Sequence, residues 1–428
     1  MKSATRVVYL FIFIFSAIYV FKHQKYTKRI EIISGYTLNF SVKRGQNVEF
    51  YLNPKADHKK GIVCIYDVHN KIVDSLILDL KVQTPNSDKK LYEHGYNYIN
   101  KFSYNTKNLK SGIYLFGNVV PFLVKETQIK NSITVVFPYA NFMALSNEGG
   151  KSFDSGNSSD GLAAEVLSLK RGLWLRNNPF FFINWIDSTY HGKSVNYISD
   201  LDLEEQANIQ QSNMLVLYGY SSFWSSKQRE NFDSFIDDGK NVLAICSNLM
   251  NNKFRYNPEN NTLAFKLWKN EELVIEPEKA LGLWSQIKPN ISSIGCSYEL
   301  GYERNVYKKS LGGFKIIQMS HPIFNFISDS LIILNNENTN SIAVDNIDFK
   351  RFPIALKDDS NFISKEILAY DHSIQNGKQT VTGIFLIKRS EKSGKLLIIG
   401  NEKWCWKNSL SKSVIQRITK NSIDYLRS

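Results

Sequence analysis

The pattern of hydrophobic and polar positions is most informative between residues 214 and 248, MLVLYGYSSFWSSKQRENFDSFIDDGKNVLAICSN. An apolar run, a polar loop, an amphipathic segment, a glycine and a second apolar run follow one another. Phe232, Phe235 and Ile236 recur at helical spacing within residues 226–238. This order predicts a strand, a helix and a second strand of a parallel sheet. Ligands bind open α/β sheets at the carboxyl edge of the strands, so we expect the functional site at the ends of these two strands.

Other apolar runs extend this pattern through the rest of the chain. Residues 133–137 and 396–400 are uninterrupted apolar segments, as expected of strands that are covered on both faces. An amphipathic segment at 413–426 predicts a closing helix. Strands that alternate with helices favour right-handed crossovers. We therefore predict that residues 129–428 form an α/β domain with a doubly wound, mostly parallel sheet.

Residues 30–128 show a different pattern. Short alternating segments such as 38–42 and 48–52 are separated by turn residues about every ten positions. This spacing predicts a small β-sandwich. The plainer interpretation of its role is a structural spacer.

The first 29 residues contain an uncharged apolar run, VVYLFIFIFSAIYVF, at positions 7–21. Basic residues flank it on both sides, and no small-residue cleavage motif follows. The pattern is typical of an uncleaved signal-anchor, so we predict a single-pass membrane segment and a globular part outside the cytoplasm. Basic residues on both flanks leave the orientation open. A buried helix of a soluble protein is the alternative interpretation.

Composition narrows the classes of function. The 428 residues are 43% hydrophobic and 13% aromatic, which is typical of packed globular domains. The formal net charge of +13 can signal an anionic partner such as nucleic acid, a membrane or an acidic glycan, but a dispersed, solvated surface charge is the favoured interpretation. No nucleic-acid-binding motif accompanies it, so no nucleic acid partner is expected. The four cysteines are widely spaced and form no CxxC pair, which disfavours a zinc ribbon or a redox motif.

Four segments, taken in order, resemble one protein family. They are FPY…NEGGKS at 137–152, YISDLDL at 197–203, GYSSFWS at 219–225 and GNEKWCW at 400–406. The series resembles the C-terminal domain family named after the large subunit of N,N-dimethylformamidase, over roughly residues 35–428. The resemblance implies a glutamine-amidotransferase-like α/β core.

The resemblance also implies an iron ion held by two tyrosines and a glutamate. The family typically has Gly-His-x-Glu-Tyr-Trp-Ser where this chain has residues 219–225. Tyr220 therefore replaces the histidine, and Phe223 replaces the tyrosine. A phenyl ring has no donor atom for iron, so the cofactor stays unassigned and family-like iron is in doubt.

Residues 239–248, GKNVLAICSN, look like the strand and nucleophile turn of class I glutamine amidotransferases. There a cysteine attacks an amide carbonyl with the help of a histidine. The likeness would make Cys246 the nucleophile, His321 its base and Glu299 the carboxylate that orients the base. No glycine follows the cysteine, although such a strained turn favours small residues. The alternatives are a cysteine buried as a small hydrophobe and a structural histidine.

Other candidates are expected where strands end. Tyr220, Trp224 and Asn248 would bind substrate at the edge of the sheet. Glu402 follows an apolar strand beside two tryptophans, where desolvation would raise its pKa and suit it to carry protons. Simple packing is the alternative for the tryptophan, and a solvated surface position is the alternative for the glutamate.

Asp200 and Asp202 are two residues apart and would share one face of a strand, where they suit a substrate amine or a metal ion. Their alternative role is capping or turn formation after the strand. Together with the family resemblance, the candidates favour hydrolysis of a carbon–nitrogen amide bond in a small molecule or a cell-surface polymer, with a small-molecule or glycan-like substrate. A degenerate site on the same fold stays open. The alternatives are a non-catalytic, membrane-tethered binding or assembly protein and a Cys-dependent amidotransferase-like enzyme.

Overall fold

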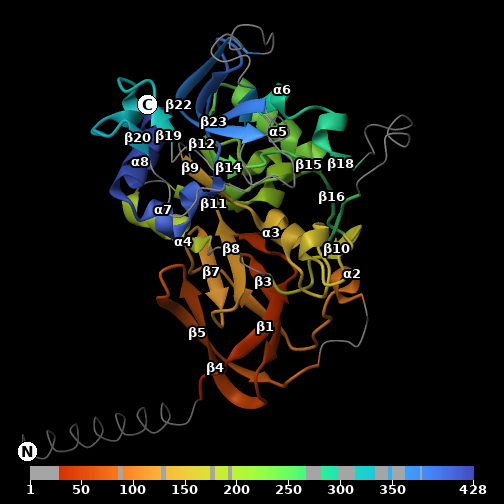
Figure 1. Cartoon of the computed structure of the whole chain (residues 1–428). Helices are drawn as coiled ribbons and strands as arrows, with labels where there is room; N and C mark the ends of the chain where they lie inside the picture. Colours follow the sequence, from red (N-terminus) through yellow and green to blue (C-terminus); the bar gives the residue numbers. More distant parts are fainter. Residues whose placement is uncertain are drawn as a thin grey trace, which may run out of the picture.

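The computed structural model describes residues 28–84, 90–126, 132–173, 179–190, 195–266, 281–296, 314–332, 346–348, 362–375 and 378–428. The N-terminal strands form one end of the molecule, and a large sheet with its helices forms the rest (Figure 1). The helices are α2 Leu91–His94, α3 Tyr139–Leu145, α4 Phe180–Thr189, α5 Ser226–Asp237, α6 Ile291–Ile294, α7 Lys407–Leu410 and α8 Ser413–Arg427.

The large sheet has ten strands in the order β11-β9-β12-β14-β24-β23-β22-β19-β20, with β21 paired to β23. Its parallel half consists of β11 Val195–Ser199, β9 Ser132–Phe137, β12 Ser212–Tyr220, β14 Asn241–Ser247 and β24 Lys395–Ile399. Its antiparallel half consists of β23 Lys378–Lys388, β22 Ser364–Gln375, β19 Phe314–Ile316, β20 Leu331–Ile332 and β21 Asn346–Asp348.

The prediction of a doubly wound, mostly parallel sheet is therefore wrong. Half of the large sheet is antiparallel, and several separate small sheets accompany it. The cause is the pair β22 and β23, which form a long hairpin beside β24. An apolar run such as 384–387 fits a parallel or an antiparallel central strand equally well, so periodicity alone does not distinguish them.

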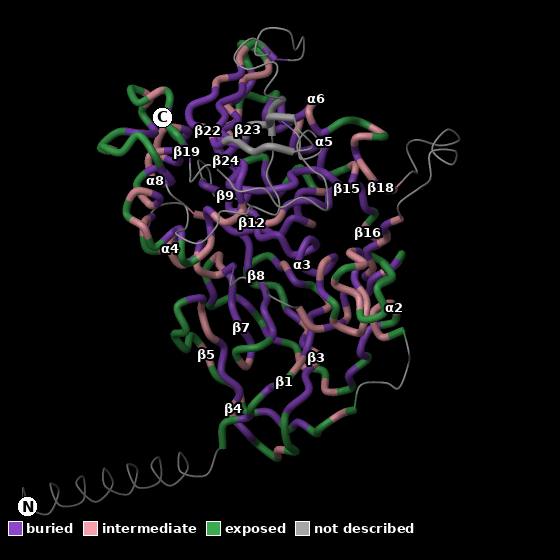
Figure 2. Tube along the Cα trace, in the orientation of Figure 1, coloured by how far each residue is buried: buried purple, intermediate pink, exposed green. Residues whose placement is uncertain are grey.

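Helices cover both faces of the parallel half. Leu215 and Leu217 of β12 share an apolar cluster with Phe232 of α5. Met214 and Val216 face the opposite cluster, which contains the buried residues of α4 and α8. Figure 2 shows the strands of this half as buried. Burial on both faces explains why these strands are continuous apolar runs, as the sequence predicted.

Helix α5 begins where the sequence places its cap. The Ser225 hydroxyl accepts from the backbone N–H of Gln228 at 3.2 Å, and the Gln228 side chain accepts from the backbone N–H of Ser225 at 2.7 Å. This reciprocal capping box satisfies two N–H groups at the start of the helix. It also fixes the point at which the chain leaves the loop after β12.

The N-terminal strands form two sheets. One contains β1 Ile32–Thr37, β3 Asn47–Pro54 and β6 Lys101–Asn105. The other contains β2 Ser41–Lys43, β8 Val120–Lys125, β7 Gly112–Phe116, β4 His58–Asp67 and β5 Ile72–Leu80. Two smaller sheets lie elsewhere and contain β10 Val166–Ser168, β17 Thr262–Ala264 and β16 Arg255–Asn257, and β13 Phe223–Trp224, β15 Asn252–Lys253 and β18 Gly282–Leu283.

The predicted independent β-sandwich is not supported. The N-terminal strands enclose an apolar cluster that contains Val48, Phe50 and Phe116. Phe40, Ile113 and Leu123 belong instead to the main apolar cluster of the large sheet, so the two parts of the molecule pack together. Polar contacts continue across this junction, where Asn196 of β11 accepts from the Ser111 hydroxyl at 2.8 Å. The predicted boundary between residues 128 and 129 lies outside the described residues and stays a prediction.

The prediction of a single-pass, membrane-anchored protein is likewise corrected. Within the described ranges, no helix combines the length and the apolar character needed to cross a bilayer. The run at 7–21 that motivated the prediction lies outside those ranges. The structure therefore gives the anchor no support, and we do not retain it.

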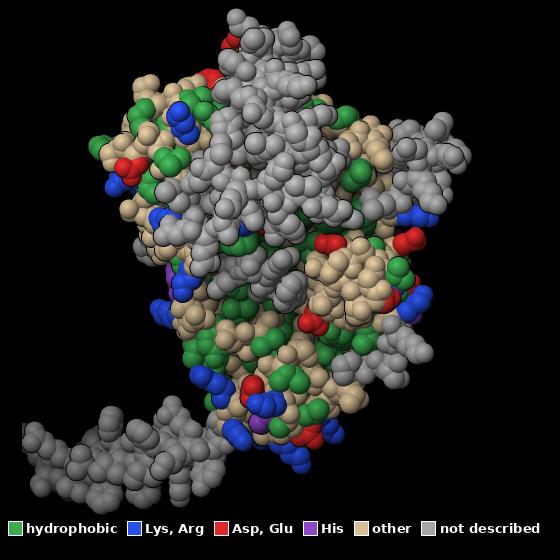
Figure 3. Space-filling view, in the orientation of Figure 1, with side chains coloured by type: hydrophobic (Ala, Val, Ile, Leu, Met, Phe, Trp, Pro, Cys, Tyr) green, Lys and Arg blue, Asp and Glu red, His purple; other side chains and the backbone are tan. Residues whose placement is uncertain are grey.

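Charged side chains are mixed on the surface. On the face drawn in Figure 3, Lys and Arg lie among Asp and Glu over the N-terminal strands. Lys55 and Glu31 pair at 3.0 Å, as do Lys101 and Glu49. Pairs as exposed as these contribute little to stability.

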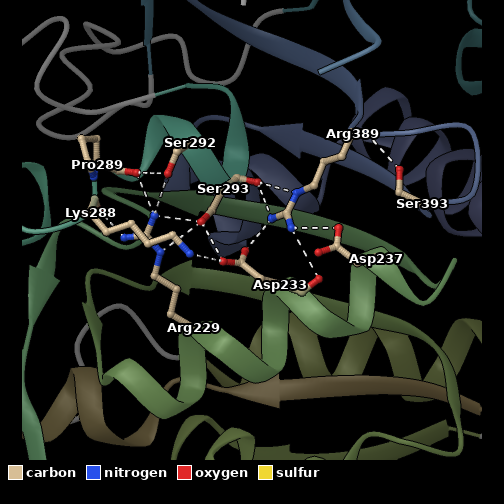
Figure 4. A network of polar contacts seen from close by, with 9 residues as sticks. All are labelled: Arg229, Asp233, Asp237, Lys288, Pro289, Ser292, Ser293, Arg389 and Ser393. Atoms are coloured by element: carbon tan, nitrogen blue, oxygen red, sulfur yellow. Dashed lines mark hydrogen bonds and ion pairs between the residues drawn. The ribbon is translucent and has the colours of Figure 1, made fainter. Parts of the chain in front are cut away.

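A polar network ties α5 to two distant segments (Figure 4). Asp233 of α5 accepts from Arg389 at 2.6 Å and from Lys288 at 2.9 Å. The Ser293 hydroxyl donates to Asp233 at 3.0 Å, and Arg229 donates to the same hydroxyl oxygen at 2.8 Å. Every labelled group therefore has a partner inside the network, which is typical of a structural clamp.

Candidate functional site

The carboxyl ends of β12 and β14 meet at one edge of the large sheet. Tyr220, the last residue of β12, lies in register with Ser247, the last residue of β14. The Asn248 side-chain amide donates from Nδ2 to the Tyr220 phenol oxygen at 3.1 Å. The Ser247 hydroxyl donates to Oε2 of Glu402 at 3.0 Å, just beyond the end of β24. Three predicted residues, Tyr220, Asn248 and Glu402, are thus brought together.

The backbone at this edge is unusual. Gly219 has φ +76° and Asn248 has φ +53°, and both values lie in the left-handed region. Glycine adopts this region freely, and asparagine is among the few other residues that tolerate it. A Cβ atom on Gly219 would meet no heavy atom within 4 Å. There is therefore open space beside the end of β12.

The turn after β14 is held by the loop after β12. The backbone N–H of Met250 donates to the Ser221 carbonyl at 3.1 Å, and that of Asn252 donates to the Ser222 carbonyl at 2.9 Å. These bonds lead into the short pairing of β13 with β15. The two loops fix each other, and the left-handed Asn248 is positioned by both.

The phenol of Tyr220 is a protonated donor at neutral pH. Burial raises the pKa of Tyr220 to about 12, and the charges of Glu402 and Asp154 add to this shift. Hydrogen bonds from Asn248 and Ser222 act in the opposite direction but do not cancel it. The phenol therefore keeps its proton and can donate it in a hydrogen bond.

Asn248 contributes an acceptor to the same place. The residue is 6% exposed, and its Oδ1 atom has no hydrogen-bond partner among the described residues. A buried acceptor without a partner costs about 1–3 kcal/mol. Native structures rarely carry this cost without a reason, so the atom is a candidate contact for a ligand.

Asp154 reaches the site from a Ser- and Gly-rich loop. Its neighbour Phe153 packs on Phe223 with ring centroids 5.7 Å apart, which holds the loop beside the residues that follow β12. The Asp154 carboxylate accepts from the backbone N–H of Gly156 at 3.0 Å. No pattern in the sequence pointed to Asp154 or Ser222 as site residues. The only signal for Ser247 was its position at the end of a predicted strand.

Cys246 and His321 do not form a catalytic pair. Cys246 is fully buried in the cluster beneath α5. His321 lies near Lys395, which begins β24 at the amino edge of the parallel strands, and its ring packs on Tyr425 at 4.9 Å. Asn241, at the amino end of β14, contacts that same edge. Cys246 lies five positions further along the strand, which corresponds to about 16 Å.

His321 also has a structural contact, since its Nδ1 atom accepts from the backbone N–H of Ile323 at 3.4 Å. Burial lowers the pKa of His321, so it is neutral at pH 7. Glu299, the proposed orienting carboxylate, lies outside the described residues.

The remaining predicted residues make internal contacts. Asp200 accepts from the backbone N–H groups of Ala140 and Asn141 at 2.8 and 3.2 Å, and burial raises its pKa to about 6. Asp202 forms a buried ion pair with Lys125. These contacts match the capping or turn-forming role that the sequence left as the alternative for both aspartates.

Trp224 is also internal. It is 2% exposed, and its indole N–H donates to the Ser221 carbonyl at 2.9 Å. Its ring packs edge-on against Phe232 at 5.3 Å. These contacts match simple packing, which the sequence left as the alternative to substrate binding for Trp224.

The family model described as N,N-dimethylformamidase beta subunit-like, C-terminal, matches residues 79–416. The chain belongs to this family. The resemblance predicted from the four sequence segments is therefore confirmed, and membership in the N,N-dimethylformamidase beta subunit-like family indicates a hydrolase-like role. No curated protein matches the chain.

A search of solved structures adds no fold assignment. The chain is similar to a structure described as the mmIFT52 N-terminal domain, with 11% identity and a TM-score of 0.34. The match covers 58% of this chain and 90% of that chain. A likeness this weak carries no argument, and the predicted glutamine-amidotransferase-like core is not confirmed.

The described residues do not fit the iron that the family resemblance implied. The Phe223 ring is 4% exposed and packs against Phe153 and Phe265, so an apolar ring stands where the motif has a tyrosine. Ser222 stands at the glutamate position of the same motif. Within the described ranges, no group of three His, Cys, Asp or Glu side chains is arranged to hold a metal ion. We therefore derive no step through iron.

Proposed function

We propose that this protein hydrolyses a carbon–nitrogen amide bond of a small molecule at the site of Tyr220, Asn248 and Glu402. One observation carries the proposal: the Asn248 amide is bound to the Tyr220 phenol, and its own Oδ1 has no partner in the described part of the chain. A protonated phenol and an unpaired carbonyl oxygen stand side by side. An amide needs this pair of partners, because it has one C=O acceptor and, if primary or secondary, an N–H donor.

The proposed chemistry assigns one task to each residue. The Tyr220 hydroxyl donates to the substrate carbonyl oxygen and stabilises the negative charge that develops there. Asn248 Oδ1 accepts from the substrate N–H and orients the amide. Glu402 takes a proton from water as the water oxygen attacks the carbonyl carbon. The C–N bond then breaks, and the same proton passes to the leaving nitrogen, giving a carboxylic acid and an amine or ammonia.

The local contacts support Glu402 as the base. The Ser247 hydroxyl donates to its Oε2 atom at 3.0 Å and fixes the carboxylate relative to the end of β14. Glu402 also adds its charge to the surroundings of Tyr220. Phenol and carboxylate therefore belong to one electrostatic unit, as an acid and a base of the same reaction must.

A second candidate function is amide binding without hydrolysis on the same fold. Phe223 favours it, because its buried ring replaces a motif tyrosine and removes a hydroxyl from the site. Both candidates require Tyr220 and Asn248. Only hydrolysis requires Glu402 as a base.

The test is the release of ammonia or amine from a panel of primary and secondary amides, with the purified full chain in buffer containing EDTA. Glu402→Gln should lower the rate about 100-fold or more, the usual contribution of a general base. Tyr220→Phe should lower it by a similar factor, as expected for loss of one oxyanion donor. Glu391→Gln and Tyr425→Phe are the matched controls, because Glu391 is 88% exposed and Tyr425 lies beside His321 at the opposite edge.

The outcomes separate the two functions. Hydrolysis that depends on Tyr220 and Glu402 supports the enzyme. Binding that depends on Tyr220, with no product from any amide, supports the binding protein. Hydrolysis that is unchanged in Glu402→Gln and Tyr220→Phe would refute the assignment of the site.

A further inference from the structure

Most charged side chains around the site have an opposite charge beside them, but one carboxylate does not. Three cations lie near its loops, and each faces a carboxylate. Lys151 pairs with Asp160 at 2.7 Å. The buried Arg171 has Glu148 as its opposing charge, and Lys403 has Glu402. Asp154 is different, because its carboxylate contacts no Lys or Arg in the described part of the chain.

The contacts that Asp154 does make are with neutral donors. Gly156 donates its backbone N–H at 3.0 Å, and the Asn157 side chain donates at 3.5 Å. These bonds hold the carboxylate in place without neutralising it. Phe153 packs on Phe223 beside it, so the loop that carries the charge is fixed against the segment that follows Tyr220.

A second observation at the same place points to a ligand with N–H groups. Asn248 is 6% exposed, and its amide is directed at Tyr220, yet its Oδ1 atom has no partner among the described residues. The carbonyl oxygen of Asn248 and the carboxylate of Asp154 both accept hydrogen bonds, and neither donates any. Open space beside Gly219 leaves room for an occupant.

We infer that the amide bound at this site also carries a protonated amine, and that Asp154 is the residue that binds the ammonium group. The inference rests on the proposed function and adds the class of substrate to it. Tyr220 and Asn248 take the amide. Asp154 takes the positive charge, since its printed partners, Gly156 and Asn157, are neutral donors and leave its charge unopposed.

The selectivity has a calculable size. Opposite charges attract each other more strongly in a partly buried site than in water, because the effective dielectric constant is lower there. A cationic amide should therefore bind about tenfold more tightly than a neutral amide of the same size. Added salt should reduce the difference, because partly exposed charges are screened.

The experiment compares three probes with the full chain. Glycinamide is the cationic amide, propionamide is the neutral one and malonamate is the anionic one. Dissociation constants are measured by isothermal titration calorimetry or ligand-observed NMR at low salt. We expect glycinamide to bind about tenfold more tightly than propionamide and malonamate to bind most weakly.

Substitutions of Asp154 and of a control aspartate test whether Asp154 binds the ammonium group. Asp154→Asn keeps an oxygen for the Gly156 N–H and should bind glycinamide and propionamide equally. Asp154→Glu keeps the charge and should retain part of the preference. Asp329→Asn, an exposed aspartate on the β19–β20 connection, is the matched control and should behave as the unaltered chain. Thermal unfolding of each variant shows whether the loop change affects folding.

Failure of the ammonium site and failure of the amide site would give different binding results. Equal binding of glycinamide and propionamide, lost in Tyr220→Phe, would overturn the role of Asp154 and leave the amide site intact. A preference for glycinamide that survives in Asp154→Asn would also overturn it. Absence of binding by all three probes would overturn both the ammonium site and the proposed amide site.

Discussion

Removal of one charge from the polar network of Figure 4 should destabilise the fold by a predictable amount. Asp233 accepts from Arg389 at 2.6 Å, and the two side chains are only 15% and 12% exposed. Asp233→Asn keeps the size and one acceptor oxygen but removes the negative charge. Arg389 and Arg229 would then face each other with Asp237 as the nearest remaining acid, at 3.3 Å from Arg389.

The expected loss of stability follows from how deeply each ion pair of Asp233 is buried. Leaving one member of a buried pair unpaired costs about 3–5 kcal/mol, and retention of an Asn hydrogen bond reduces this to about 2–3 kcal/mol. The pair with Lys288 adds about 0.5 kcal/mol, because the Lys288 side chain is 53% exposed. We expect a loss of about 3 kcal/mol in the free energy of unfolding, measured by urea denaturation followed by circular dichroism.

The pH dependence gives a second, independent signature. Burial raises the pKa of Asp233, but the Arg389 charge and the Lys288 hydrogen bond outweigh it, and the net pKa is lowered. A carboxyl whose folded-state pKa is depressed stabilises the fold above its unfolded pKa of about 3.9. This contribution is lost as pH falls through the folded-state pKa. The difference between the unaltered chain and Asp233→Asn should therefore be full at pH 7 and shrink below about pH 4.

Asp237→Asn is the control for this prediction. Its side chain is 60% exposed and makes one contact with Arg389, so it should cost under about 1 kcal/mol. A cost for Asp233→Asn no greater than that of Asp237→Asn would contradict the role of the buried charge. A difference in stability that stays constant down to pH 3 would contradict the lowered pKa of Asp233.

Two further substitutions test the backbone. Gly394→Ala should lower the free energy of unfolding by about 2–3 kcal/mol in urea denaturation, because its Cβ would lie 1.9 Å from the Lys240 carbonyl oxygen. Gly112→Ala, whose nearest contact is 3.4 Å, should cost far less, and equal losses would contradict the clash. Asn248→Gly should raise the free energy of unfolding by about 1 kcal/mol while abolishing glycinamide binding in calorimetry, since glycine removes both the positive-φ cost and the unpaired oxygen. A variant that still binds would contradict the role of Asn248.

The sequence predicted the parallel half of the sheet and the meeting of its strand ends. Uninterrupted apolar runs indicated β9, β12, β14 and β24, and helical spacing indicated α5. Because parallel strands end at a common edge, Tyr220, Asn248 and Glu402 could be placed together before any coordinates existed. Site geometry that follows from strand direction is accessible to sequence reasoning.

What could not be predicted depends on pairing and on backbone angles. The antiparallel partner of β24 is set by the β22–β23 hairpin, whose apolar pattern suits either strand direction. Cys246 was a candidate because it ends an apolar strand, but strand alternation places it with Val242 and Ala244 beneath α5. The residue that turns away from the sheet is Asn248, whose φ is +53°. Only asparagine's tolerance of the left-handed region hinted at this.

The two polar clusters of this protein differ in a way that separates structure from function. In the network around Asp233, each charged group has a partner, and its cost of burial is repaid inside the fold. At the edge of the sheet, Asn248 combines a left-handed backbone with an unpaired oxygen, and Asp154 has no opposing cation among the described residues. Fixed strain and unmet hydrogen bonds at one place cost several kcal/mol in sum, about 1–3 for each. A ligand that supplied an N–H group and a positive charge would meet both needs at once, and this is why we propose the ligand site at the unsatisfied cluster.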